Sequence, residues 1–108
     1  MVGTTLCVGV IGMYHSGIGG GGFMLVRSET GEYESIDFRE MAPAAAHQDM
    51  YEGNENGSIF GGLAVAVPGE IMGLEYLWWK YGRLSWGEVV GPAVGVAREG
   101  FEGEFIFF

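Results

Sequence analysis

The sequence is poor in positive charge and in cysteine, and it has no long apolar run. Five lysines and arginines stand against fourteen aspartates and glutamates in 108 residues, which gives a formal net charge of −9. Nucleic acids and anionic membrane surfaces are bound through clustered lysine and arginine, so this balance argues against both as partners. The one cysteine, Cys7, can form no disulfide within the chain, and its apolar neighbours predict a buried, inert thiol.

Signals of several common classes are also missing. No apolar run reaches the roughly 18 residues of a spanning helix, and no secretory signal peptide is recognisable at the start. The sequence has no Cys/His spacing typical of zinc sites and no Gly-x-Ser-x-Gly elbow. We therefore expect no metal and no other cofactor.

Glycine is what the sequence has in abundance, with five glycines between positions 17 and 22. Such a run costs about 0.5–1 kcal/mol per glycine in an ordered element, so it marks a sharp turn or a close approach of the backbone. The run formally matches the dinucleotide pattern G-x-G-x-x-G, but that loop needs a helix after it. Here an apolar strand is expected to follow, so a nucleotide-binding loop is the minor alternative.

Residues 23–27 and 33–39 predict a β-hairpin, with Gly31 in the turn between them. The first strand is apolar from residue 23 to 26, which is typical of a strand covered on both faces. The second strand alternates and ends at Arg39, with Asp37 on the same face. From the residues alone, Arg39 either pairs with a nearby carboxylate or binds an anionic ligand, and the plain ion pair is favoured.

The sequence indicates the structure of residues 2–22 and 42–58 less clearly than that of the hairpin. Residues 2–12 fit a buried helix or a buried strand equally well. His15, in the loop that follows, has no acidic neighbour in sequence and is interpreted as structural in preference to a general base. We expect a short helix over 42–51, begun by Pro43. A polar loop over 52–58 should follow it, in which Asn56-Gly57-Ser58 formally meets the glycosylation pattern.

The last third of the chain predicts one strand and two helices. Residues 61–69 predict a short buried strand. An apolar stripe at helical spacing predicts a helix over 70–81 that ends at Gly82, with Trp78 in the core. Ser85 and Glu88 form a capping box that opens a second helix. This helix either kinks at Pro92 or restarts with Pro92 at its first position, and it closes at Gly100.

Four blocks of the sequence closely resemble the γ-glutamyltranspeptidases, also called glutathione hydrolases. The blocks are His15–Val26, Asp37–Ala46, Gly61–Glu70 and Tyr81–Phe101, and they occur in the order that this family shows near the start of its large subunit. The resemblance spans about residues 3 to 101. It implies an α/β fold of the N-terminal-nucleophile hydrolase type, a partial αββα sandwich in which a β-hairpin has flanking helices. By the same match, residues 2–12 are expected to be helical.

The resemblance also implies a chemistry and a division of labour. Family members remove or transfer the γ-glutamyl group of glutathione, using a threonine freed at the start of the small subunit by self-cleavage; its own α-amine acts as the base. No threonine of this chain matches that position, so we expect no catalytic residue here. The arginine of the Asp-Phe-Arg-Glu block binds the substrate α-carboxylate in the family, and Arg39 is the matching residue. The resemblance therefore reverses the preference for a plain ion pair.

The expected extent follows from the same match. We interpret residues 1–101 as a fragment of the large subunit and 102–108 as a tail outside the family pattern, as an unspliced intron or frameshift would produce. The chain alone should be inactive. Its partners would be glutathione or another γ-glutamyl compound, the rest of the large subunit and the small subunit. The intact family member would be in the secretory pathway, extracellular or membrane-anchored. The alternative is a non-catalytic remnant or interaction module.

Overall fold

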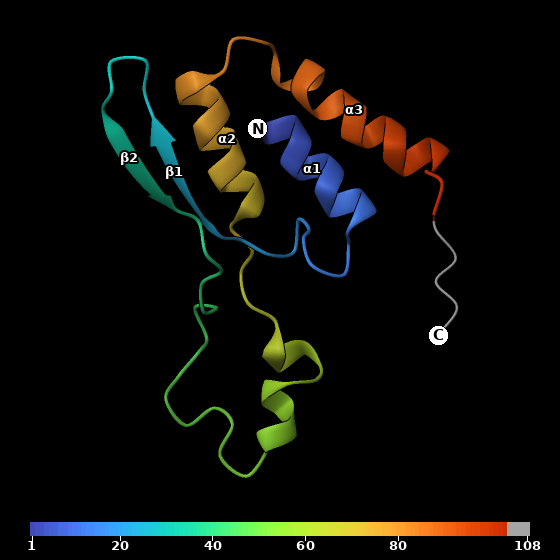
Figure 1. The fold of residues 1–108 in the computed structure, drawn as a ribbon. Helices are drawn as coiled ribbons and strands as arrows, with labels where there is room; N and C mark the ends of the chain where they lie inside the picture. Colours follow the sequence, from blue (N-terminus) through green and yellow to red (C-terminus); the bar gives the residue numbers. More distant parts are fainter. Residues whose placement is uncertain (104–108) are drawn as a thin grey trace.

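A computed structural model describes residues 1–103, and Figure 1 shows the course of the chain. The described part contains three α-helices, one two-stranded antiparallel sheet and two short 3-10 helices. It is therefore a small α/β unit. In chain order the elements are α1 (Val2–Ile11), β1 (Phe23–Arg27), β2 (Tyr33–Asp37), η1 (Glu55–Ser58), η2 (Gly62–Ala64), α2 (Glu70–Tyr81) and α3 (Trp86–Glu99).

The predicted hairpin is present. β1 and β2 pair antiparallel, with Leu25 opposite Ser35 at the centre of the register. Gly31 lies in the connecting turn with φ +91°, a left-handed conformation that favours glycine. β2 ends at Asp37, so the predicted strand over 33–39 is too long by two residues and Arg39 lies just beyond the strand, after Phe38.

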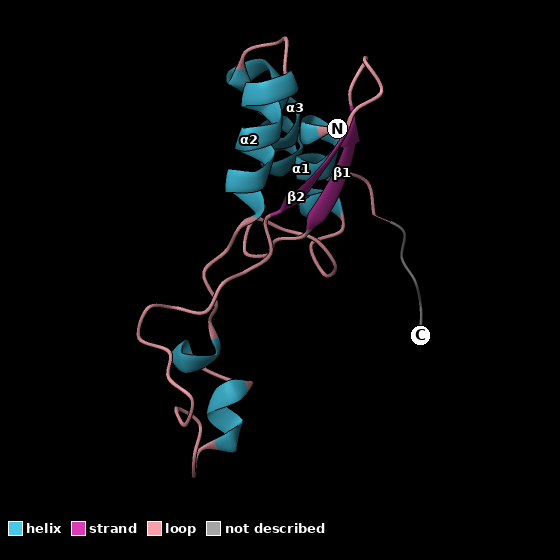
Figure 2. Ribbon diagram, turned by 90° about the vertical axis from the view of Figure 1, so that its left-hand side faces the viewer, coloured by secondary structure: helices cyan, strands magenta, loops and turns pink. Residues whose placement is uncertain are grey.

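Only one face of the hairpin is covered. Met24 and Val26 pack against the core, while Phe23 and Leu25 are 67% and 69% exposed. Because side chains alternate along a strand, these two pairs lie on opposite faces. Figures 1 and 2 show all three helices on the same side of the sheet. The expectation that residues 23–26 are covered on both faces is therefore wrong for this chain.

Residues 2–11 form a helix, which settles the alternative that the residue pattern left open. α1 packs mainly along α3 and also touches α2. At Gly3 the two helices approach so closely that an added Cβ would lie 2.8 Å from the carbonyl oxygen of Val89. The small residues of this segment therefore serve close helix packing. Cys7 is half-buried and packs against the core.

The core is small and lies between the three helices and one face of the hairpin. α2 has the predicted bounds, but its stripe is fully buried only at its centre: Leu74 is 1% exposed, whereas Ile71 is 40% exposed. Trp78 packs against the core as predicted, and its ring lies 5.4 Å from that of Trp86. The buried cluster consists of Val2, Leu6, Ile36, Leu74, Leu77 and Ala93.

The two long helices end at glycine for different reasons. Gly100 closes α3 with φ +83°, a left-handed conformation. Gly82 follows α2 with φ −71°, a value that any residue can adopt, so backbone conformation does not require a glycine there. The requirement is the lack of a side chain. An added Cβ there would clash with the Trp78 carbonyl oxygen. The predicted stop at Gly82 is confirmed, with close approach as its cause.

α3 begins with the predicted capping box. The Glu88 amide donates to Ser85 Oγ at 3.4 Å, and the Ser85 amide donates to Glu88 Oε2 at 2.8 Å. These bonds satisfy donors that a helix start leaves free. The Ser85 hydroxyl also donates to Glu88 Oε2 at 2.6 Å, and this bond, followed by the one from the Ser85 amide, lowers the pKa of the Glu88 carboxyl. Pro92 lies inside the helix, which continues through it to Glu99.

Two predicted elements are absent from residues 42–69. Residues 42–51 form successive turns, such as the bond from the Ala46 amide to the Pro43 carbonyl, and no helix. A helix this short is stable only when one face packs, and most of this segment is exposed. Residues 61–69 form no strand: η2 occupies the middle, and Val67 alone pairs, in an isolated bridge to Met41.

Residues 42–67 extend away from the helices and the hairpin (Figures 1 and 2). The radius of gyration is 17.4 Å, against about 13 Å for a compact domain of this length. Within residues 1–103, no helix is long and apolar enough to cross a bilayer.

Candidate functional site

Arg39 stands directly beyond the end of β2 and is exposed. Its backbone amide donates to Asp37 Oδ1 at 3.0 Å, so the neighbouring carboxylate holds the backbone of Arg39. The ion pairs recorded in residues 1–103 are Lys80–Glu34 and Arg83–Glu29, and the Arg39 guanidinium takes part in neither. The plain ion pair that competed with ligand binding is therefore not formed among the described residues.

Two glycines fix the backbone path around Arg39. An added Cβ at Gly21 would clash with the Phe38 carbonyl oxygen and lie 3.0 Å from the Glu40 amide. An added Cβ at Gly69 would also clash with the Phe38 oxygen and lie 3.1 Å from the Arg39 oxygen. The glycine bend and the turn before α2 thus both lie close to the backbone of Phe38 and Arg39. This close approach explains part of the glycine run that the sequence singled out.

Hydrogen bonds hold the same segment on both sides. Phe38 exchanges bonds with Gly22, at 2.9 Å from the Phe38 amide and 3.3 Å from the Gly22 amide. Met41 exchanges bonds of 3.0 and 2.8 Å with Val67. Arg39 lies between these two pairs, so its backbone is fixed while its side chain stays free to bind.

Arg39 lines a cavity of about 440 Å³ between the end of β2 and the start of α2. The walls are mostly apolar, and Arg39 is the one basic residue among the lining residues, beside the acids Glu34 and Asp37. Such a cavity suits a small anion with an aliphatic portion. The other lining residues include Asp37, Phe38, Met41, Val67, Pro68, Met72 and Tyr76.

A second cavity, of about 360 Å³, lies on the glycine bend and contains two carboxyl groups, those of Glu40 and Glu70. Glu70 is 5% exposed, and its Oε1 atom has no hydrogen-bond partner among the described residues. Burial raises the pKa of the Glu70 carboxyl, and the negative charge of Glu40 raises it further. Nothing in the sequence marks Glu70 as a site residue, because an acid in the first turn of a helix is usually solvated and favourable there.

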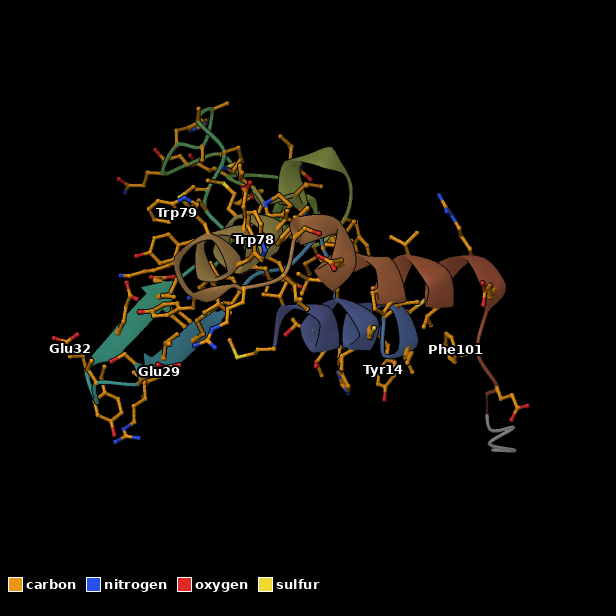
Figure 3. All side chains as sticks on the ribbon, turned by 90° about the horizontal axis from the view of Figure 1, so that it is seen from above. Tyr14, Glu29, Glu32, Trp78, Trp79 and Phe101 are labelled. Atoms are coloured by element: carbon orange, nitrogen blue, oxygen red, sulfur yellow. The ribbon has the colours of Figure 1, made fainter. Side chains whose placement is uncertain are left out.

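The other sequence candidates lie elsewhere or show no site chemistry. His15 is exposed and its ring lies 4.2 Å from that of Tyr14, which Figure 3 places at the far end of α1. Trp79 is 74% exposed and points away from α1 and α3 (Figure 3). Asn56 is exposed on η1. No group of three or more His, Cys, Asp or Glu side chains in residues 1–103 is placed to hold a metal ion.

Comparisons with known proteins identify a family. A profile of the family described as gamma-glutamyltranspeptidase matches residues 1–104. The glutathione hydrolase proenzyme of Arthroderma benhamiae is 64% identical over 89 residues, which are 82% of this chain and 15% of that protein. The glutathione hydrolase of Aspergillus flavus is 55% identical over 101 residues, which are 94% of this chain and 16% of that protein. The chain thus spans about one sixth of the length of these curated relatives.

Solved structures match as well. The crystal structure of Helicobacter pylori gamma-glutamyltranspeptidase superposes with a TM-score of 0.87 at 32% identity, covering 93% of this chain and 30% of that one. The enzyme from Pseudomonas nitroreducens complexed with L-DON gives 0.82 at 40% identity, covering 89% and 30%. These names do not favour the alternative of a non-catalytic remnant. By its profile match and its close relatives, the chain belongs to the γ-glutamyltranspeptidase family.

Proposed function

We propose that this chain supplies part of the substrate site of a glutathione hydrolase, and that Arg39 binds the α-carboxylate of the γ-glutamyl group there. The observation that supports this most is that Arg39 lines a cavity of about 440 Å³ and that its guanidinium takes part in neither ion pair of residues 1–103. A guanidinium is planar and can form two parallel hydrogen bonds to a carboxylate, which fixes both position and orientation.

The apolar walls of the cavity complete the recognition. Met41 and Met72 line it together with Pro68, so the aliphatic part of a γ-glutamyl group would meet apolar surface. Removing water around the guanidinium strengthens its attraction for a carboxylate. Asp37 is already bonded to the Arg39 amide, which leaves the guanidinium for the ligand.

The chemical step belongs to another part of the protein. In our proposal the threonine hydroxyl of the small subunit attacks the γ-carbonyl, an ester forms, and the amine of the substrate leaves with a proton. Water or an amino acid then attacks the ester and releases the threonine. This chain orients the glutamyl group for both steps. Its partners are the rest of the large subunit and the small subunit.

We propose that the hairpin is one part of an αββα sandwich. The helices cover one face of β1 and β2, and the outer face carries Phe23, Leu25 and Tyr33, which are 67–69% exposed. A second sheet packed on that face would bury these side chains, as in sheet-on-sheet packing.

We also propose that the intact protein is extracellular or membrane-anchored and reaches that place through the secretory pathway. This rests on the family resemblance. Detection of the protein in the culture medium or on the cell surface would support it, and confinement to the cytosol would contradict it.

A chimera tests the role of Arg39. Residues 1–101 replace the matching segment of the Arthroderma benhamiae relative, and kcat and KM are measured with a chromogenic γ-glutamyl anilide. Arg39→Ala should raise KM about 10- to 150-fold, because a charge-assisted contact of about 1.5–3 kcal/mol is lost. The KM of Arg39→Lys should lie between those of the unchanged chimera and Arg39→Ala, since lysine keeps the positive charge and lacks the planar guanidinium.

The matched control is Arg98→Ala. Arg98 is exposed in the last turn of α3 and should leave KM unchanged. An Arg39→Ala chimera that folds, matures and keeps the original KM would refute the proposal.

A further inference from the structure

Glu70 is a buried acid with one carboxylate oxygen that no residue in the described part of the chain satisfies. It is the first residue of α2, and its side chain is 5% exposed, with no hydrogen-bond partner for Oε1 among the described residues. A carboxylate at a helix start normally accepts from the free backbone amides there. Here the amides of Gly69 and Glu70 both donate to the Gly20 carbonyl at 3.0 Å. These two amides therefore do not bind the Glu70 carboxylate.

A second carboxylate faces the same place. Glu40 and Glu70 both line the 360 Å³ cavity on the glycine bend. The position of a Cβ on Gly20 would be 3.4 Å from Glu40 Oε1 and 3.9 Å from Glu70 Oε2. The two acids therefore converge over Gly20, where the missing side chain leaves them room. Two adjacent carboxylates repel each other, and burying one of them raises the cost.

Among the described residues, no cation balances these acids. His15 is the one group lining the cavity that could become positive, and it stacks on Tyr14 without forming an ion pair. The two recorded ion pairs use Glu34 and Glu29. A metal ion is not favoured, because the two acids and His15 are not placed to hold one together, and no other such group exists in residues 1–103.

We propose that this cavity is a socket for a basic side chain from the part of the assembled family protein that lies outside these 108 residues. The chain spans about one sixth of the length of its curated relatives, so a much larger surface has to dock against it. An arginine fits the chemistry best: its several donors can reach both carboxylates, and it is the usual basic residue in buried ion pairs. The socket is independent of the role proposed for Arg39.

The effect of Glu70→Gln on the thermal midpoint, measured in the isolated chain and in the chimera, tests this proposal. In the 108-residue chain, Glu70→Gln should raise the thermal midpoint, because it removes a buried charge that has no partner. In the chimera with the Arthroderma benhamiae relative, the same change should lower the midpoint by about 3 °C or more, because it strands the buried basic group. Glu75→Gln, on the same helix but exposed, should change neither midpoint.

Two comparisons within the chimera keep the test decisive even if the isolated chain shows no thermal transition. Glu70→Asp keeps the charge and should lose less stability than Glu70→Gln, which keeps the size. A chimera that Glu70→Gln stabilises or leaves unchanged holds no basic group in the socket, and the proposal fails. A larger loss from Glu70→Asp than from Glu70→Gln would show that shape and not charge matters, and would also overturn it.

Discussion

Single side chains tie the hairpin to the helices. Glu34 on β2 accepts hydrogen bonds from three donors on α2: Tyr76 at 2.7 Å, Lys80 at 2.8 Å, and Tyr81. The bond to Lys80 and those to the two tyrosines lower the pKa of the Glu34 carboxyl from 4.5 to about 2. They also raise the pKa of Lys80 and of Tyr81. This cluster is the most extensive set of side-chain bonds between β2 and α2 in the described residues.

The lowered pKa of Glu34 predicts acid sensitivity. Because the folded-state pKa lies below the unfolded-state value, the contribution is fully present above about pH 4.5 and is lost as pH falls toward 2. We expect the thermal midpoint of the chain to drop over this window and Glu34→Gln to flatten the drop. Circular dichroism melts between pH 6 and 2.5 measure it. Glu29→Gln is the control, because Glu29 forms only an exposed pair with Arg83; equal slopes for Glu34→Gln and the unchanged chain would contradict the account.

For single residues, the sequence predicted where a residue lies along the chain's elements better than which atoms it contacts. The alternation of residues 33–39 predicted Asp37 and Arg39 on one strand face, but β2 ends at Asp37 and Arg39 lies beyond it. It did not reveal that Asp37 binds the Arg39 backbone, since that depends on the bend after the strand. Nor did it reveal the burial of Glu70, which depends on how the glycine bend folds over the start of α2.

Some glycines in the helices let neighbouring elements pack closely, but not every helical glycine has this role. Gly73 on α2 faces Phe38, and an added Cβ there would clash with the Phe38 side chain. Gly95 on α3 has open space at the same position. α2 therefore needs a missing side chain to lie against the end of the hairpin, and α3 does not need one at Gly95.

The same substitution should have opposite effects at these two sites. Both changes to alanine gain about 1 kcal/mol of helix propensity. At Gly73 the clash with Phe38 should outweigh this gain, so Gly73→Ala lowers the free energy of unfolding by about 1–2 kcal/mol. Gly95→Ala should raise it by about 0.5–1 kcal/mol. Urea unfolding of the 108-residue chain measures both, and a stabilising Gly73→Ala would show that Phe38 does not lie against α2.

The spacing of apolar residues correctly predicted the helices and strands that bury one face in the core. α2 and α3 carry helical spacing and caps, and the hairpin carries strand alternation and a turn glycine. Residues 42–51 were expected to form a helix begun by Pro43, but most of their side chains are exposed and no apolar face is covered. Residues 61–69 were expected to form a strand, yet a strand needs a paired neighbour, and only Met41 pairs, with Val67.

The whole molecule exposes more surface than a compact protein of its size. Its accessible area is 8628 Å², against about 5,800 Å² for a folded monomer of 11.6 kDa. Much of the excess is apolar and lies on the outer face of the hairpin and along residues 59–67, where Phe60 is 72% exposed. Such patches mark surfaces that another part of a protein covers.

The isolated chain should therefore bind a γ-glutamyl compound weakly at best, and it should not turn over substrate. Incubation of the purified chain with a chromogenic γ-glutamyl anilide should release no product above the rate of a heated sample, because no residue of the chain matches the nucleophilic threonine. Measurable turnover that tracks the chain through purification would contradict this expectation.

The central claim concerns a carboxylate, so a substrate without one tests it most directly. In the chimera, kcat/KM is compared for a γ-glutamyl anilide and for the 4-aminobutanoyl anilide, which lacks only the α-carboxylate. The unchanged chimera should prefer the first strongly. Arg39→Ala should reduce that preference about tenfold or more, by weakening the first substrate and leaving the second unaffected. A preference that Arg39→Ala leaves intact would show that another group reads the carboxylate.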